Sequence, residues 1–393
     1  MRRVVAVVVV MHGLVHLLGA AKGLGWADVT QLSQPIGTAQ GVVWLTAAAL
    51  AVVTGVLLAM TSRWWWAVGA VAVVVSQAVI ITSWSDAKAG TLANAVLLVA
   101  VLYGYASQGP SSYRAQYTHL AATTLSEPFL AGVVTEADLA NLPEPVAGYL
   151  RQAGTVGHPR VTSLHARIHG RIRSGASKPW MRFTGEQVNT FGPEPSRLFL
   201  IDATMLGLPL DVLHDFVRGS ARMRVKACSL VPIVNATGPE MDQGETVTLF
   251  NDLCVLAPAA LIDAPITWQP VDDRHARGAF TNGAHTVTAD LIFNDDRELV
   301  DFVSDDRLRA SADGRTFTPQ RWSTPLGGYR VVGSRRIATY GEGRWHAPEP
   351  EGEFTYIEFN IDHITYNPGT PLTTSTGNAT GINTAPLSSS VAP

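Results

Sequence analysis

Apolar residues are concentrated in the first 108 positions of the chain, where they form four long segments. The segments cover about 4–20, 40–60, 64–83 and 92–107. A helix needs about 20 apolar residues to cross the hydrocarbon core of a bilayer, and three of the four segments reach this length easily. The pattern therefore predicts an N-terminal four-helix transmembrane bundle over residues 1–108.

Beyond a juxtamembrane linker predicted at 109–141, the pattern changes. A short helix is predicted from the LPEP sequence at 142–145 to about Gln152. From residue 162 to 172, apolar and polar residues alternate, which is typical of a half-buried antiparallel strand. Similar runs predict further strands at about 181–191, 197–205, 221–227, 275–280, 286–293, 299–308, 320–323, 329–332, 337–345 and 355–366.

Turn and helix signals complete the predicted fold. An Asn-Gly pair at 282–283 and an Asp-Gly pair at 313–314 indicate hairpin turns. One apolar helix at about 239–257, with proline and carboxylates near its start, interrupts the strands. We therefore expect a mainly antiparallel β domain at 142–367, a curved meander or half-barrel with an inserted helix. The uncharged residues 368–393, rich in Thr, Ser, Gly and Pro, predict a disordered tail.

Charge and cysteine content exclude several classes of function. All but five of the 29 basic and two of the 32 acidic residues follow residue 108, which gives the downstream part a formal charge of −6. A mildly acidic domain argues against nucleic acid as a partner. Cys228 and Cys254 are the only cysteines and form no CxxC pattern, so buried thiols are expected rather than a disulfide framework or zinc site. No metal or cofactor is predicted.

The distribution of basic residues predicts the orientation in the membrane. With the N-terminus inside, the basic residues divide four to two between the cytoplasmic and outer sides: Arg2, Arg3, Arg63 and Arg114 against Lys22 and Lys88. Because positively charged loops stay cytoplasmic, we expect a multi-pass cell-membrane protein whose β domain lies in the cytoplasm. The first segment could instead be a signal peptide, although its two histidines and the three following segments favour an uncleaved helix. If it does not cross, the orientation inverts.

Four polar residues within the apolar segments are candidates for function. His12 and His16 are four residues apart and therefore share one helix face, while Gln77 and Asn94 lie in the third and fourth segments. Polar groups inside a bilayer are costly, so each needs a partner or a role. The histidine pair could bind metal or haem or relay protons. Alternatively, the side chains hold the helices together by hydrogen bonds.

Carboxylates at the start of the inserted helix allow two interpretations. Glu240, Asp242 and Glu245 lie where negative charge stabilises a helix N-terminus. Asp242 and Glu245 also share one face, and could perform acid–base or metal chemistry beside the sheet. Ligand-binding candidates on the second strand, which could face the same cavity, are Trp180, Glu186 and Gln187.

Five short sequences resemble a bacterial family of uncharacterised four-helix membrane proteins with a C-terminal β-rich domain of unknown function. They are HGLVHLLG at 12–19, WSDAKAGT at 84–91, LPEPV at 142–146, PWMRFTGEQ at 179–187 and GPEMDQGE at 238–245. The resemblance covers about residues 5–367 and implies this domain organisation, but no activity. The sequence contains none of the P-loop, GxGxxG, GxSxG or HExxH motifs.

Three hypotheses follow from these observations. A curved sheet with a helix on its concave face forms a natural pocket, so the first is a membrane-tethered binding module for a lipid-like or other apolar small molecule. This architecture is similar to lipoprotein-carrier half-barrels. The second is a membrane-bound enzyme that uses the acidic cluster. The third is a proton or redox unit in the bundle. The expected partners are the lipid bilayer and an apolar small molecule.

Overall fold

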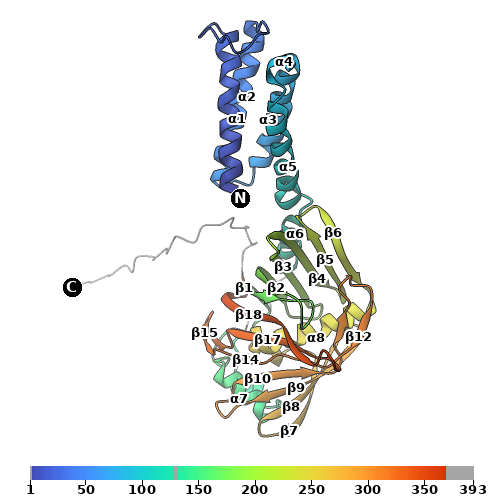
Figure 1. The fold of residues 1–393 in the computed structure, drawn as a ribbon. Helices are drawn as coiled ribbons and strands as arrows, with labels where there is room; N and C mark the ends of the chain where they lie inside the picture. Colours follow the sequence, from blue (N-terminus) through green and yellow to red (C-terminus); the bar gives the residue numbers. More distant parts are fainter. Residues whose placement is uncertain (1, 127–131, 369–393) are drawn as a thin grey trace, which may run out of the picture. The chain divides into compact units, whose positions relative to one another are not determined.

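The computed structural model describes residues 2–126 and 132–368 and divides the chain into two compact units (Figure 1). The first contains Met1–Gly109, and the second begins at Pro110. The predicted disordered tail at 368–393 lies outside the described residues, apart from Pro368.

The first unit is a bundle of closely packed helices. It contains α1 (Arg2–Gly23), α2 (Thr38–Ala59), α3 (Trp65–Thr82), the short α4 (Trp84–Ala87) and α5 (Gly90–Gln108). A Cβ atom on Gly41 of α2 would lie 2.8 Å from the backbone of Gly23 in α1, so glycine is needed for this close approach. Large apolar side chains such as Val74 and Leu92 face outward. Within the described ranges, four helical stretches are long and apolar enough to cross a membrane, as the sequence pattern predicts.

The second unit is built on one large antiparallel sheet of 14 strands. Along the sheet the order is β6-β5-β4-β3-β2-β1-β18-β17-β13-β10-β9-β8-β7, and β14 pairs with β17. The strands of this sheet are β1 (Ser163–Ile172), β2 (Met181–Thr190), β3 (Ser196–Met205), β4 (Leu208–Val217), β5 (Ser220–Ala227), β6 (Val231–Thr237), β7 (Ile266–Asp272), β8 (His275–Asn282), β9 (His285–Phe293), β10 (Leu299–Ser304), β13 (Trp322–Ser323), β14 (Leu326–Gly327), β17 (Tyr340–His346) and β18 (Glu353–Tyr366). Two small hairpins pair β11 (Leu308–Ala310) with β12 (Phe317–Pro319) and β15 (Arg330–Val332) with β16 (Arg335–Ile337).

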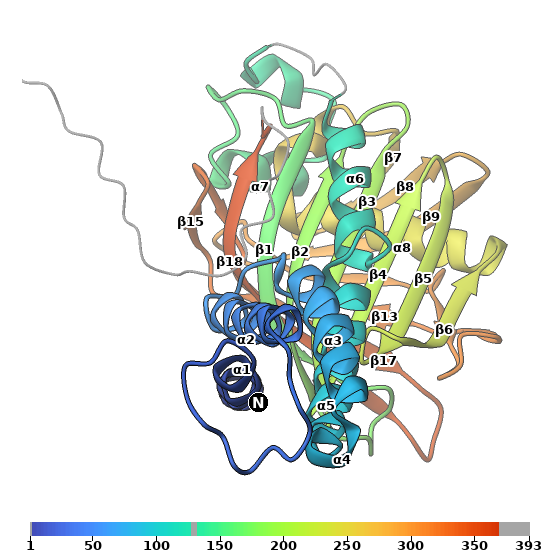
Figure 2. The ribbon, with the colours of Figure 1, turned by 90° about the horizontal axis from the view of Figure 1, so that it is seen from above.

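The sheet curls around helix α8 (Pro239–Leu256), the predicted inserted helix. Strands β5 and β6 at one end of the sheet and β8, β9 and β10 towards the other end all contact α8. Because β6 and β7 remain the two edges, the described residues form a strongly curved open sheet and no closed barrel (Figures 1 and 2). The prediction of an antiparallel, curved β domain is confirmed at this level.

Other helices add buried residues to the core of the β domain. Helix α7 (Glu144–Gln152), with η1 (Glu136–Leu139) before it, contributes buried residues such as Tyr149 to the large core, as does η2 (Pro258–Ile262) after α8. The pairs Asn282–His285 and Ala310–Phe317 close the two predicted hairpin turns, which are confirmed.

The segment 109–141 is more than the linker expected from the sequence. It contains α6 (Tyr113–Leu125), which packs on the outer face of β2, β3 and β4, opposite α8 (Figure 2). Tyr117 and Ala121 are buried there against apolar residues of the sheet. The predicted linker is corrected accordingly, because this weakly apolar stretch forms a helix that is stabilised by tertiary packing.

Candidate functional site

Two carboxylates of α8 face the concave side of the sheet and share one arginine. Glu245 and Asp252 are seven residues apart and therefore project from the same side of the helix, two turns apart. Arg197 of β3 lies between them, with Nη1 3.2 Å from Oε2 of Glu245 and Nε 2.7 Å from Oδ2 of Asp252. All three side chains are buried. Together they fix α8 against the strand.

Amides of β2 complete the surroundings of Asp252. Gln187 and Asn189 are separated by one residue and therefore share the inward face of the strand, and Asn189 lies opposite Arg197 in the register. Their side-chain nitrogens donate to Oδ2 of Asp252 at 2.7 and 2.9 Å. The Arg197 bond is the third on this oxygen. All three bonds from the strands end on Oδ2, so Oδ1 of Asp252 is left to accept a hydrogen bond from another group.

Glu245 is held in its ionised form. Arg307 and His214 approach its carboxylate to 3.6 and 3.3 Å, in addition to Arg197, and Thr248 donates a hydrogen bond of 3.1 Å. Burial favours the protonated acid, but His214 when protonated, together with Arg197 and Arg307, favours the carboxylate more strongly, so the pKa of Glu245 is lowered. Burial lowers the pKa of His214 to about 4, which keeps the imidazole neutral near pH 7. Two arginines thus balance two carboxylates.

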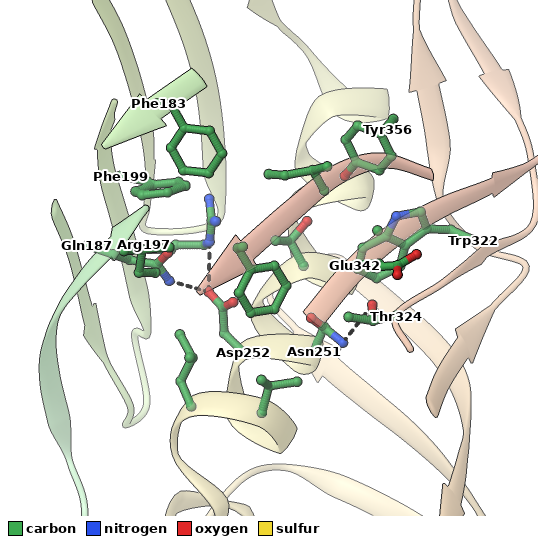
Figure 3. Close-up of a pocket in the computed structure, with 17 residues that line it drawn as sticks. Phe183, Gln187, Arg197, Phe199, Asn251, Asp252, Trp322, Thr324, Glu342 and Tyr356 are labelled. Atoms are coloured by element: carbon green, nitrogen blue, oxygen red, sulfur yellow. Dashed lines mark hydrogen bonds and ion pairs between the residues drawn. The ribbon is translucent and has the colours of Figure 1, made fainter. Parts of the chain in front are cut away.

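A cavity of about 80 Å³ opens beside this group (Figure 3). Gln187, Arg197 and Asp252 form one polar side of it, and Asn251 donates a 3.1 Å hydrogen bond to Thr324 at another point of the wall. Glu342 also lines the cavity and is paired with Arg344 at 2.9 Å. The remaining walls are mainly apolar or aromatic and include Ile168, Phe183, Phe199, Val255, Leu256, Trp322, Tyr356, Ile357 and Phe359.

The three acids predicted as one cluster lie in different environments. Glu240 is exposed. Asp242 accepts a hydrogen bond from the backbone N–H of Ala221 and so joins α8 to β5. Glu245 alone belongs to the buried group beside the cavity. Within residues 2–126 and 132–368, no three His, Cys, Asp or Glu side chains are arranged to hold a metal ion. The structure therefore does not bring the predicted acids together.

The predicted ligand-binding residues also separate. Gln187 lines the cavity, whereas its neighbour Glu186 projects from the opposite face, where it pairs with Arg114 of α6 at 3.2 Å. Trp180 stacks with Arg171 and Arg173, whose guanidinium carbons lie 4.4 and 4.5 Å from its ring centre. Of the three, only Gln187 belongs to the candidate site.

Sequence reasoning missed most of the charged group. Asp252 could have been found, because a carboxylate seven residues after Glu245 interrupts the apolar side of a predicted core helix. Arg197 and His214 carry a weaker signal, as polar residues on inward positions of strands. Arg307, which follows the end of β10, carries none, because its approach to Glu245 depends on the closure of the sheet around α8.

All four polar residues predicted inside the bundle join one hydrogen-bonded group. His16 Nε2 lies 2.8 Å from Ser76 Oγ, and His12 Nε2 lies 3.0 Å from Oδ1 of Asn94. Asn94 donates to Gln77 at 2.9 Å. Ser76 of α3 is the member that the sequence did not suggest. The group links α1, α3 and α5.

The sequence model of one protein family, described as a family of unknown function (DUF6544), matches residues 132–359. The chain belongs to this family. The DUF6544 region includes every residue that lines the cavity, from Ile168 to Phe359. No curated protein matches the chain.

Solved structures that are similar to the DUF6544 protein at low sequence identity include the following two. One is a DUF1329 family protein from Desulfovibrio piger, with 10% identity and a TM-score of 0.34, over 58% of this chain and 95% of that chain. The other is a putative outer membrane lipoprotein-sorting protein domain from Vibrio parahaemolyticus, with 11% identity and a TM-score of 0.32, over 53% of this chain and 87% of that chain.

Proposed function

We propose that this protein is a membrane-tethered binding module for a lipid-like or other apolar small molecule. The observation that carries the proposal is the cavity between α8 and the curled sheet, with mainly apolar and aromatic walls and polar groups fixed at one side. Convergent polar groups in a largely apolar concavity are the usual features of a small-molecule site. The four apolar helices would hold this domain at the bilayer.

The size of the cavity limits what it holds. Sites for drug-sized ligands begin at about 300 Å³, well above the 80 Å³ found here. The cavity therefore suits one end of an elongated molecule rather than a whole lipid. The remainder of such a ligand would extend through the open side.

Charge further limits the end of the ligand that enters. Arg197 is already paired with Glu245 and Asp252, and Glu342 with Arg344. A carboxylate or phosphate would meet the oxygens of Asp252 and Glu342 without a free cation beside it. Burying an unpaired charge is costly, whereas a hydroxyl can donate to Oδ1 of Asp252. We infer a neutral polar end, such as an alcohol or a monoacylglycerol.

The test is binding of fluorescent probes by the full-length protein in nanodiscs. A monoacylglycerol with a fluorescent acyl chain should bind, and the fatty acid with the same chain should bind more weakly. Ile357 lines the cavity and is partly exposed, so Ile357→Trp should fill the space and weaken the neutral probe about tenfold, or 1.4 kcal/mol. Val331→Trp, at an exposed position away from the cavity, should leave binding unchanged.

Two outcomes would count against the proposal. Protein that carries no co-purified ligand in the nanodiscs and still binds neither probe would exclude the binding module. Equal binding by Ile357→Trp and the unmodified protein, with unchanged circular dichroism, would place the ligand elsewhere. Tighter binding of the fatty acid would leave the binding module standing but overturn the inferred neutral end.

A further inference from the structure

Two neighbouring hairpins of the sheet end in exposed apolar side chains. The β3–β4 turn and the β5–β6 turn lie at the same end of the sheet, because β4 pairs with both β3 and β5. Six large apolar side chains there are between 37% and 88% exposed: Met205, Leu206, Leu208, Leu230, Val231 and Ile233. We call these six residues the apolar tips. Large apolar side chains gathered in exposed positions on neighbouring turns make this end of the sheet a candidate interaction site.

The backbone of the β3–β4 turn shows that its leucine carries a local cost. Met205 pairs with Leu208, so Leu206 and Gly207 form a two-residue turn, with φ of 50° and 83°. Turns with two positive φ angles favour Asn or Gly at the first position, because a branched apolar side chain is strained there. Yet Leu206 is 88% exposed and gains almost no packing within the domain.

The opposite end of the same sheet provides a comparison. The β4–β5 turn is also a two-residue turn with positive φ, at Arg218 and Gly219. Its first position holds a charged residue whose side chain is 83% exposed. The same backbone geometry thus carries arginine at one end of the sheet and leucine at the other. The apolar residue at position 206 is therefore not a requirement of the turn.

Chain connectivity links the apolar tips to the last apolar helix. Only residues 109–112 separate Gln108, the end of α5, from Tyr113, the start of α6, and this connection spans at most about 18 Å. Lys226, near the end of β5 that leads to the second tip, has its ammonium 4.5 Å from the ring centre of Tyr113. Arg114 pairs with Asp202 near the corresponding end of β3. The tips therefore lie at the end of the sheet where the chain enters from α5.

We propose that the apolar tips insert into the surface of the lipid bilayer that the apolar helices span. A bilayer within reach of a four-residue connection is the apolar phase available to these side chains, and transfer out of water favours their insertion. Strand pairing with a second copy is disfavoured, because Pro232 removes a backbone donor from the edge strand β6. The contact would fix the β domain at the membrane surface through a second attachment besides α5.

The test places a spin label at each end of the sheet in the full-length protein reconstituted into liposomes of neutral phospholipid. The variants are Leu206→Cys and Arg218→Cys, each combined with Cys228→Ser, since the remaining Cys254 is fully buried. The measured quantity is the ratio of each label's collision rate with apolar oxygen to its collision rate with a water-soluble nickel complex. This ratio should be several-fold higher for the label at position 206 than for the matched label at position 218.

Two results would overturn the proposal. Equal and high accessibility of both labels to the nickel complex would show that the tips face water. Protection of position 206 from both oxygen and nickel would show that protein covers the tips. Separately, Leu206→Asn should raise the thermal stability of the detergent-solubilised chain, because asparagine suits the turn. A lowered melting temperature would contradict the argument that leucine is costly there.

Discussion

Arg197 is the residue on which the buried charges of the β domain depend. Its guanidinium lies between Glu245 and Asp252 and is the cation that contacts both carboxylates, while Arg307 approaches only Glu245. A buried ion pair adds little net stability, because desolvation offsets the attraction, yet loss of one partner commonly costs about 3–5 kcal/mol. The group therefore serves to fix the position of α8 against β3, which shapes the cavity.

His214 should make the stability of the β domain depend on pH. Burial lowers the pKa of His214 to about 4 in the folded protein, against 6.5 in an unfolded chain. Between these values the unfolded chain binds the proton and the folded protein does not, so the stability of the folded state decreases as the pH is lowered. From pH 7 to 5 the loss is about 2 kcal/mol. Differential scanning calorimetry in detergent should show that His214→Gln loses less stability between pH 7 and pH 5 than the unmodified protein.

Asp301 serves as a control, because its protonation should change the stability of the domain in the opposite direction to that of His214. Burial raises its pKa to about 6, so the folded protein holds this proton more tightly than the unfolded chain, and acidification through pH 6 adds stability. Asp301→Asn should therefore increase the loss between pH 7 and 5. If His214→Gln and the unmodified protein lost stability equally, then protonation of His214 would not be coupled to unfolding. The groups around His214 that set its state are Glu245, Arg197, Arg307 and Asp215.

At the scale of elements, proline residues explain why three of the longer strands were not predicted from the sequence. Every strand predicted from alternation overlaps an observed strand, but the short β12 and β14 and three longer strands, β4, β6 and β7, were not predicted. Each of the three longer strands contains a proline: Pro209, Pro232 and Pro270. Proline lacks a backbone donor and is read as a strand breaker, yet it is tolerated at strand ends and sheet edges. β6 and β7 are the two edges, and Pro209 is near the start of β4, so all three positions are allowed.

The polar group of the bundle shows a similar limit. Spacing placed His12 and His16 on one face of α1, but it could not identify the partner on α3, because several polar residues were available. Ser76 has one hydroxyl proton and two acceptors within reach, His16 Nε2 at 2.8 Å and Asn94 Oδ1 at 2.9 Å. With both histidines neutral, this proton goes to His16. His16 donates from Nδ1 to the carbonyl of His12 and accepts from Ser76, while His12 donates to Asn94.

Ser76→Ala should loosen the packing of α1 against α3. The substitution removes the 2.8 Å bond to His16 and leaves a buried imidazole nitrogen without a partner. Hydrogen bonds between transmembrane helices contribute about 0.6 kcal/mol on average and up to about 1.7, so a loss of about 1 kcal/mol is expected. This loss of stability can be measured by unfolding the full-length protein in mixed micelles with increasing fractions of SDS. The helical circular dichroism signal follows the unfolding.

Thr46→Ala is the matched control for this measurement. The hydroxyl of Thr46 is exposed and bonds only to the Val42 carbonyl of its own helix, so its removal should have almost no effect. A loss for Ser76→Ala no larger than that for Thr46→Ala would show that the polar group contributes nothing to the bundle.

At the scale of the whole molecule, the candidate site depends on contacts that local patterns do not contain. Gln187 and Asp252 meet because β2 lies over α8, and Tyr356 reaches the same cavity because β18 returns to pair with β1 at the middle of the sheet. Alternation predicts which face of a strand turns inward, so Gln187 could be proposed. The order of the strands is set by long-range pairing. The residues of the opposite wall, such as Trp322 and Glu342, could therefore not be predicted from local patterns.

The orientation of the chain is the last property that the sequence predicts. Four crossings would return the chain to the side of its N-terminus, and the four-to-two division of basic residues favours the cytoplasm. A fluorescent protein fused after Asn367 should therefore fluoresce, and alkaline phosphatase fused there should be inactive. Fusions after Lys88, between the third and fourth spans, should give the reverse. Phosphatase activity after Asn367 would mean an odd number of crossings, in which case the binding module, its cavity and the apolar tips would all face the outer side of the membrane.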